Sequence, residues 1–164
     1  MTAFTPVNLL LLSLALYLLY TRLRPSSPAA PPPAHEAIVF QSFTPKMLQR
    51  YNGTDDPRVY LAVAGGVFDV TSGAGFYGPG GSYSNFAGRD ASRGLAVGSF
   101  DDDVLPSIDG PLDDLKDLAA PERETLAGWV EHFQGKYILV GKLISEDEKK
   151  EMDLKEDEKR HPVF

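Results

Sequence analysis

Apolar residues run almost without interruption through residues 4–20, in the segment FTPVNLLLLSLALYLLY. No charged residue falls within this run, and no polar stripe of the kind that a surface helix carries divides its leucines. A helix over these residues would rise roughly 26 Å, slightly under the ~30 Å hydrocarbon core of a bilayer. The pattern therefore predicts one N-terminal transmembrane helix over residues 4–20.

Basic residues follow this apolar run. Arg22 and Arg24 lie directly after it, whereas no basic side chain precedes it. Under the positive-inside rule, this asymmetry places the rest of the chain in the cytosol. A cleaved signal peptide is the alternative, but its usual basic segment before the apolar run is missing. Because a short span suits a thin bilayer, we expect a single-pass protein of the endoplasmic reticulum membrane with a cytosolic C-terminal domain.

Two segments of biased composition flank the central part of the chain. Residues 21–35 are rich in proline and alanine and predict a semi-rigid linker of the polyproline type. Residues 145–164 carry many charges and almost no apolar side chain, which predicts a solvated helix or a disordered tail. Ser145 and Glu148 have the spacing of a helix capping box. The folded domain is therefore expected over residues 36–144.

The first half of this domain reads as a strand, a short helix and a hairpin. Residues 38–40, IVF, predict a short apolar strand. A helix should follow, in which Thr44 caps, Pro45 begins and Gly53 closes. The segment VYLAVAGGVFDVT predicts a β-hairpin, with Gly65 and Gly66 supplying the positive φ of a two-residue turn.

The second half alternates short helices with a final strand. Asp90 can cap a helix through ASRGLAV, and Pro121 opens another that Gly135 ends. One face of that second helix carries four apolar residues, Leu126, Trp129, Val130 and Phe133. The segment KYILVGKLI then predicts the last strand. The fold class is α+β, with short helices forming a cup beside a small sheet.

Composition narrows the possible functions. The 164 residues carry a formal charge of -7, so no basic face is available for the phosphates of a nucleic acid. The absence of cysteine excludes disulfides, zinc-thiolate sites and iron–sulfur clusters. Of three histidines, only His132 falls inside the predicted domain. No nucleophile–base pair or metal triad is present, so we do not expect an enzyme.

The glycine-rich stretch FYGPGGSYSNFAGRDASRG, which follows VFDVT, resembles the haem-binding segment of the cytochrome b5 fold. In that fold a strand ending in Asp-Val-Thr leads to a His-Pro-Gly-Gly loop and then to an Ala-Gly-x-Asp-Ala-Ser/Thr helix start. This chain keeps Pro79, Gly80, Gly81, Ala87, Gly88, Asp90, Ala91 and Ser92. Gly78 stands where the fold has its ligand histidine, so the resemblance does not imply an electron carrier with two imidazole ligands.

Two tyrosines in this stretch, with the later GKY and VGKLI, make residues 36–144 similar to the membrane-associated progesterone receptor component family. This family includes plant membrane steroid-binding proteins and the yeast damage-associated haem protein. The resemblance implies that Tyr83 is the axial iron ligand, that Tyr77 supports it by hydrogen bonding, and that Lys136 and Tyr137 complete the pocket near the haem propionates. It also implies an N-terminal anchor. Many relatives carry an acidic residue and a proline where this chain has Gly80 and Ser82.

A tyrosine ligand has a chemical consequence. A free phenol has a pKa of ~10, so ionising it at pH 7 costs about 4 kcal/mol. Ferric iron offsets this cost because a hard cation deprotonates its ligand. A hydrogen bond from Tyr77 to the Tyr83 phenolate would add about 1.5–3 kcal/mol. Phenolate favours ferric over ferrous iron, which suits haem sensing or delivery better than electron transfer.

Simpler interpretations exist for several of these residues. Tyr77 and Tyr83 are also explained as half-buried turn aromatics, and only the surrounding motif favours haem. Arg89 and Arg93 are expected to pair with Asp90 or to remain solvated. The acidic segment DDDVLPSIDGPLDD lacks EF-hand spacing and reads as a surface loop.

The sequence therefore predicts a membrane-anchored protein that binds ferric haem through an axial tyrosinate. The resemblance further implies that it regulates or supports haem-thiolate monooxygenases of sterol metabolism, and that it binds steroids. Two alternatives stay open, a cytochrome b5-like electron carrier and a haem-independent sterol-binding adaptor. A homodimer also stays open.

Overall fold

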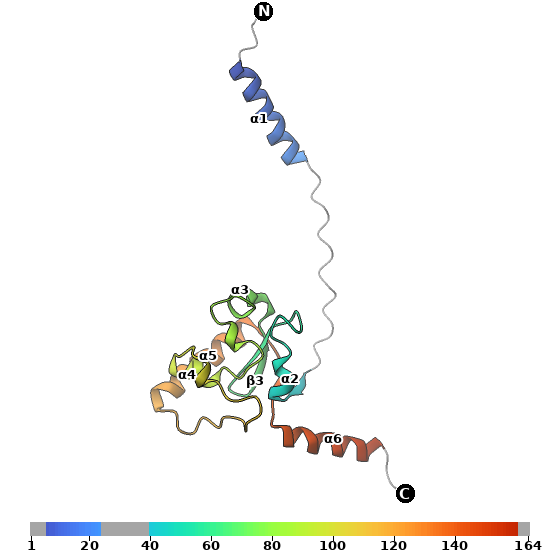
Figure 1. The fold of residues 1–164 in the computed structure, drawn as a ribbon, viewed down its shortest axis with the longest axis vertical. Helices are drawn as coiled ribbons and strands as arrows, with labels where there is room; N and C mark the ends of the chain where they lie inside the picture. The colour runs from blue at the N-terminus through green and yellow to red at the C-terminus, as the bar shows by residue number, and fades with distance from the viewer. Residues whose placement is uncertain (1–5, 24–39, 161–164) are drawn as a thin grey trace, which may run out of the picture. The chain divides into compact units, whose positions relative to one another are not determined.

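The computed structural model describes residues 6–23 and 40–160 (Figure 1). The chain consists of two compact units, residues 1–37 and 38–164. In the first unit, helix α1 (Pro6–Leu23) occupies most of the predicted transmembrane segment. The described leucines of α1 are exposed, from 51% at Leu12 to 71% at Leu10. Within the described residues, no helix has both the length and the apolar character needed to cross a membrane. The transmembrane anchor over residues 4–20 stays a prediction, and most of the 21–35 linker lies outside the described residues.

The second unit contains a four-stranded sheet in the order β1-β4-β3-β2. Its strands are β1 (Gln41–Phe43), β2 (Tyr60–Val63), β3 (Gly66–Asp69) and β4 (Ile138–Leu143). β1 runs parallel to β4, and the two other pairings are antiparallel. The first strand was predicted at residues 38–40, of which 38 and 39 lie outside the described residues; Phe40 is not in a strand, and β1 starts at Gln41. Phe43, which is fully buried and pairs with Leu143, fixes this later register.

The turn of the hairpin also differs from the prediction by one residue. Val63 pairs with Gly66, so the two loop residues are Ala64 (φ 47°) and Gly65 (φ 79°), not Gly65 and Gly66. Gly66 belongs to β3, where a Cβ atom would lie 3.1 Å from Leu139 and 3.2 Å from Phe68. Close packing, not turn geometry, is therefore what Gly66 provides.

Five helices belong to the second unit. They are α2 (Pro45–Gln49), α3 (Ala74–Tyr77), α4 (Ser92–Val97), α5 (Ala120–Lys136) and α6 (Glu146–Arg160). Three short 3₁₀ turns accompany them, η1 (Thr71–Gly73), η2 (Ser84–Phe86) and η3 (Asp102–Val104). The predicted α+β class with a small sheet and short helices is confirmed.

The prediction of helix starts and ends was right in part. Asp90 is not the N-cap of α4, which starts at Ser92 with Ala91 as its N-cap, although the Asp90 carboxylate accepts the Ser92 N–H. Thr44 caps α2 as expected, because its hydroxyl accepts the Met47 N–H at 3.3 Å. However, α2 ends at Gln49 and not at Gly53, since the chain turns to form a bridge between Asn52 and Val59.

Hydrogen bonds explain where α5 ends and where α6 begins. α5 continues through Gly135 to Lys136, because the amide of Tyr137 still bonds to the carbonyl of Phe133 at 2.8 Å. The predicted capping box of α6 is present, with the Glu148 carboxylate 2.9 Å from the Ser145 amide. The Ser145 hydroxyl in turn accepts the Glu148 N–H.

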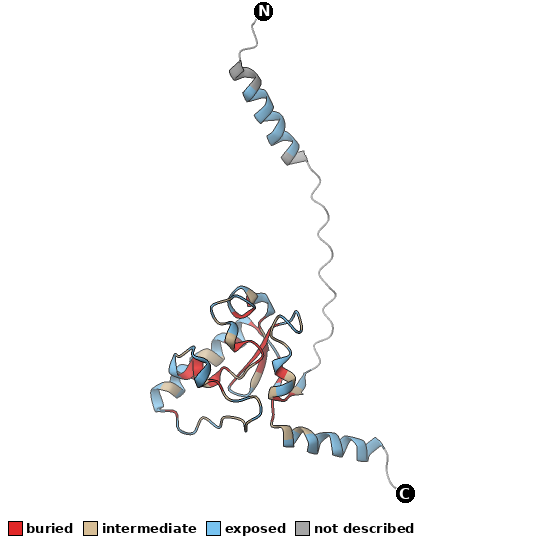
Figure 2. Ribbon diagram, in the orientation of Figure 1, coloured by how far each residue is buried: buried red, intermediate tan, exposed pale blue. Residues whose placement is uncertain are grey.

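Buried residues, red in Figure 2, run along the strands of the sheet. They form two separate hydrophobic clusters. Alternation along β2 sends Leu61 and Val63 into one core and Tyr60 and Ala62 into the other. The first core is completed by helices, and the apolar face predicted for α5 packs into it through Leu126, Trp129, Val130 and Phe133. α6 has no buried residue, as expected for a solvated helix. The first core also holds the aromatic residues that form the candidate site.

Candidate functional site

Three tyrosines from separate parts of the domain meet at the edge of the first core. Tyr77 ends α3, Tyr83 precedes η2, and Tyr137 lies between α5 and β4. The ring centre of Tyr77 is 6.0 Å from that of Tyr83 and 6.2 Å from that of Tyr137. The buried ring of Phe133 lies 6.1 Å from Tyr77 and 5.4 Å from Tyr137. The structure thus brings together three of the four predicted site residues, and we call these three residues the tyrosine cluster.

Tight backbone turns between Tyr77 and Tyr83 create this proximity. The Gly81 amide bonds to the Gly78 carbonyl, and the Tyr83 amide bonds to the Phe76 carbonyl, both at 2.9 Å. A Cβ atom on Gly81 would collide with the Phe76 carbonyl, so this loop can fold back only with glycine there. The loop therefore returns Tyr83 to the side of Tyr77.

Tyr77 and Tyr83 differ in their surroundings. Burial is the main cause that raises the pKa of Tyr77 to about 12, and the neighbouring Tyr137 and Tyr83 raise it further. Tyr77 is therefore a neutral hydroxyl at pH 7, able to donate a hydrogen bond. Tyr83 is only partly buried, and its hydroxyl has no hydrogen-bond partner among the described residues. Of the two phenols, that of Tyr83 is therefore the more exposed to solvent.

The last predicted residue, Lys136, is exposed at the end of α5. Its ammonium lies 5.2 Å from the ring centre of Tyr137, which is a cation–π distance. The side chain is thus held beside the tyrosine cluster while its charge stays in solvent, where an anionic group can reach it.

Sequence reasoning missed one member of the site. The ring of Phe100 lies 4.8 Å from that of Tyr83 and 5.6 Å from that of Phe86. Phe86 also stacks on Tyr83 at 6.4 Å. Phe100 lies after the end of α4 and directly before the irregular acidic segment that starts at Asp101, where the sequence has no periodicity, so no local pattern marked it.

The two arginines near the motif do not pair with Asp90. Arg93 instead forms ion pairs with Asp113 and Asp117, and Arg89 donates to the Pro106 carbonyl at 2.8 Å. Asp90 accepts from both the amide and the hydroxyl of Ser92, and its burial raises its pKa. These residues hold the acidic loop that precedes α5 against the domain.

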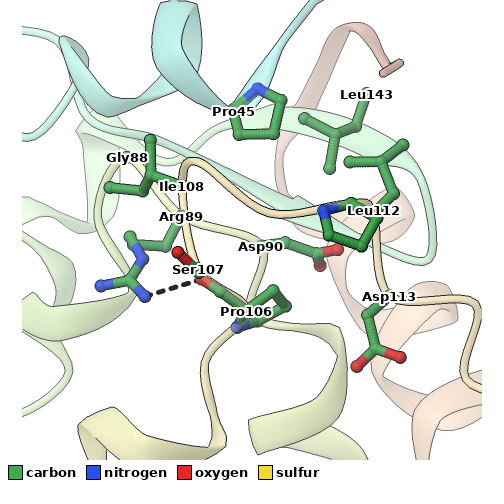
Figure 3. A pocket seen from close by; sticks show the side chains of 11 residues that line it. Pro45, Gly88, Arg89, Asp90, Pro106, Ser107, Ile108, Leu112, Asp113 and Leu143 are labelled. Atoms are coloured by element: carbon green, nitrogen blue, oxygen red, sulfur yellow. Dashed lines mark hydrogen bonds between the residues drawn. The ribbon is translucent and has the colours of Figure 1, made fainter. Parts of the chain in front are cut away.

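A small cavity lies among Arg89, Asp90, Pro106 and Leu112 (Figure 3). Its volume of about 20 Å³ is room for one water molecule, and none of its lining residues belongs to the tyrosine cluster. A flat macrocycle or a sterol is far larger than this space. The chemistry of the aromatic side chains, and not this cavity, therefore indicates where a large ligand would bind.

The family described as "Cytochrome b5-like Heme/Steroid binding domain" matches residues 44–144, and the chain belongs to this family. A solved protein of Arabidopsis thaliana, described as having a cytochrome b5 like fold, is 42% identical with a TM-score of 0.56. The alignment covers 71% of this chain and 100% of the Arabidopsis protein. The predicted cytochrome b5-like domain is thereby confirmed.

Two curated relatives place the chain more narrowly. "Cytochrome P450 regulator dap1" of Schizosaccharomyces pombe is 46% identical over 138 residues, which are 82% of this chain and 83% of that protein. "Membrane-associated progesterone receptor component 2" of Homo sapiens is 46% identical over 122 residues. Those residues are 74% of this chain but only 53% of the human protein. The resemblance to the progesterone receptor component family is confirmed.

The donor chemistry of the tyrosine cluster fits a haem. Tyr83 offers a hydroxyl without a protein partner, and Lys136 offers a cation beside the cluster. Two exposed aromatic residues occur near Tyr83. Phe76, which precedes Tyr83 in the chain, is 57% exposed, and Phe100, whose ring contacts that of Tyr83, is 46% exposed. His132 is exposed on α5, and the ring contacts of its imidazole are with Trp129 and Phe133, not with a residue of the tyrosine cluster.

Proposed function

We propose that this protein binds ferric haem through the phenolate of Tyr83. The observation that carries this proposal is the environment of the Tyr83 hydroxyl, which has no hydrogen-bond partner among the described residues while rings of Phe86 and Phe100 flank its own ring. A hard ferric ion is the partner that an otherwise unpaired phenolate favours. When bound, the haem would supply a ferric centre of low reduction potential.

Tyr77 would stabilise the ionised ligand. Because its own pKa is about 12, Tyr77 keeps its proton at pH 7 and can donate it to a neighbouring phenolate. The centres of the two rings lie 6.0 Å apart, so Tyr77 is the tyrosine of the cluster that is next to the proposed ligand. A hydrogen bond to a charged acceptor contributes about 1.5–3 kcal/mol.

Lys136 and Tyr137 would bind the haem propionates. The ammonium of Lys136 is exposed beside Tyr137 and so would be available to pair with a propionate carboxylate. The contribution of Lys136 should fall as salt is added, because an exposed ion pair is screened.

The biological role that we propose is support of haem-thiolate monooxygenases of sterol metabolism. The relative from S. pombe named as a cytochrome P450 regulator, matched over most of both chains, supports this role. Non-enzymatic action agrees with the names of the relatives, which are those of a regulator and a receptor component. We further propose that α1 attaches the protein to the endoplasmic reticulum membrane, since its described leucines are exposed.

A second candidate function is sterol binding without haem, favoured by the steroid in the family description. An electron carrier is less well supported, because the described residues offer no second ligand of the imidazole type beside Tyr83. A redox titration distinguishes an electron carrier from the other candidate functions, because a carrier needs a reduction potential that cellular reductants can reach.

The test is a haemin titration of the full chain in detergent, with wild type beside Tyr83→Phe. We expect a high-spin ferric spectrum in the wild type that the substitution abolishes or severely weakens. Tyr51→Phe is the matched control, because Tyr51 is partly buried but stacks on Tyr60 in the other core. An unchanged spectrum in Tyr83→Phe would reject Tyr83 as the ligand. Saturable binding of a labelled sterol without haemin uptake would favour the sterol adaptor.

A further inference from the structure

The segment after α4 turns sharply back toward Tyr83. Gly98 adopts the left-handed conformation (φ 67°), and the Ser99 amide bonds to the Gly94 carbonyl at 3.0 Å, which closes the helix. The hydroxyl of Ser99 then bonds to the carboxylate of Asp101 at 3.1 Å. These bonds hold the chain on both sides of Phe100, so the direction of its ring is set by the backbone.

A hydrogen bond ties this segment to the turn that carries Tyr83. Asn85, two residues after Tyr83, donates its side-chain amide to the backbone carbonyl of Phe100 at 2.7 Å. The two residues are 15 positions apart in the chain, so this contact joins two segments that would otherwise move independently. Phe86 supports both, because its buried ring stacks on Tyr83 and packs at a tilt against Phe100 at 5.6 Å.

The exposure of Phe100 is unusual for a large apolar residue held so firmly. Its ring is 46% exposed, yet its carbonyl is bonded and its ring packs on Tyr83 at 4.8 Å. Apolar surface left in water costs roughly 25 cal/mol per Å², so burial alone does not explain this placement. Covering one face of Tyr83 does explain it.

We propose that Asn85 and Phe100 form a clamp that positions Tyr83 for its ligand. Phe100 restricts the rotation of the Tyr83 ring and covers one face of it, and Asn85 keeps Phe100 in place. Both are positioning residues, and their effect on haem rests on the proposed function of Tyr83. The clamp itself is a property of the protein without any ligand, so it can be measured separately.

The first experiment probes the protein before haemin is added. N-acetylimidazole acetylates accessible tyrosine hydroxyls, and mass spectrometry of the digested full chain gives the rate at Tyr83. We expect Phe100→Ala and Asn85→Ala to raise this rate about threefold or more, and Phe100→Leu to restore most of the wild-type protection. Val97→Ala is the control, because Val97 is a 40% exposed apolar residue that precedes the same turn and has no aromatic ring to pack on Tyr83. Circular dichroism of each variant verifies that it is folded.

The second experiment measures the release of haemin to an excess of a haem-scavenging apoprotein. We expect release about fivefold to tenfold faster from Phe100→Ala and about threefold to fivefold faster from Asn85→Ala, with Val97→Ala like the wild type. If Phe100→Ala and Val97→Ala show the same acetylation rate at Tyr83 and the same rate of haemin release, the clamp proposal is wrong. Haem binding through Tyr83 would not be affected by that result. If the wild type takes up no haemin through Tyr83, the proposed function fails and the acetylation rates alone decide the clamp.

Discussion

The hydroxyl oxygen of Tyr137 lies directly over Gly73, so closely that a Cβ atom at Gly73 would approach it to 2.7 Å. The same atom would lie 3.3 Å from the ring of Tyr77. Gly73 is buried where η1 meets α3, and Tyr137 reaches it from the far end of α5. This close approach lets two members of the tyrosine cluster pack against one backbone position.

Gly73→Ala should therefore disturb the tyrosine cluster. We expect the free energy of unfolding to fall by about 1–3 kcal/mol, because the added methyl group overpacks a buried contact. Haemin affinity should fall as well, since Tyr77 and Tyr137 must move. Urea denaturation and haemin titration measure the two effects. Gly75→Ala is the control, because a Cβ atom there meets nothing within 4 Å. Equal behaviour of the two variants would contradict the packing role of Gly73.

Tyr77→Phe should weaken haem binding without removing the iron ligand. The ring and its packing on Phe133 remain, while the hydroxyl that would donate to Tyr83 is lost. We expect affinity for haemin to fall about tenfold to a hundredfold, with the high-spin ferric spectrum kept. A spectrum lost as completely as in Tyr83→Phe would instead make Tyr77 the ligand.

The ion pairs of Arg93 should contribute unequally to stability. The Asp113 side chain is 14% exposed and also accepts the Leu115 amide, whereas that of Asp117 is 68% exposed. We expect Asp113→Asn to cost about 1–2 kcal/mol in free energy of unfolding, whereas Asp117→Asn should leave the free energy of unfolding close to that of the wild type. Chemical denaturation measures both. If Asp117→Asn cost as much as Asp113→Asn, burial would not explain the ranking.

The pair of Asp56 and Arg58 should make stability depend on acid pH. The hydrogen bonds from Arg58 outweigh burial and lower the pKa of Asp56 from 3.8 to about 2. A carboxyl group whose pKa is lowered by folding stabilises the folded state at pH values above its ordinary pKa. This stabilisation is lost as the pH falls through the pKa of the group in the folded state. The wild type should thus lose stability relative to Asp56→Asn between about pH 4 and pH 2.

The size of this effect is limited because the Arg58 side chain is 46% exposed and water screens the pair. We expect at most about 1 kcal/mol from urea denaturation at a series of pH values. Asp103→Asn, at an exposed carboxylate, is the control. A constant difference between wild type and Asp56→Asn down to pH 2 would contradict the assignment.

Local chemistry let the sequence determine most elements of this domain. Thr44 before Pro45, and Ser145 with Glu148, mark helix starts because caps are formed within three residues. The apolar positions of α5 recur at helical spacing, so its buried face could be assigned without a structure. The family motif likewise lies within one short stretch, which is why Tyr77 and Tyr83 could be singled out.

Only the tertiary structure decided which distant residues meet. The sequence placed the hairpin turn at Gly65 and Gly66, but packing of Leu139 against Gly66 shifts it to Ala64 and Gly65. Phe100 lies on Tyr83 because a left-handed glycine and a hydrogen bond from Asn85 redirect the chain. Such contacts depend on how whole elements pack in three dimensions, and no periodicity along the chain encodes them.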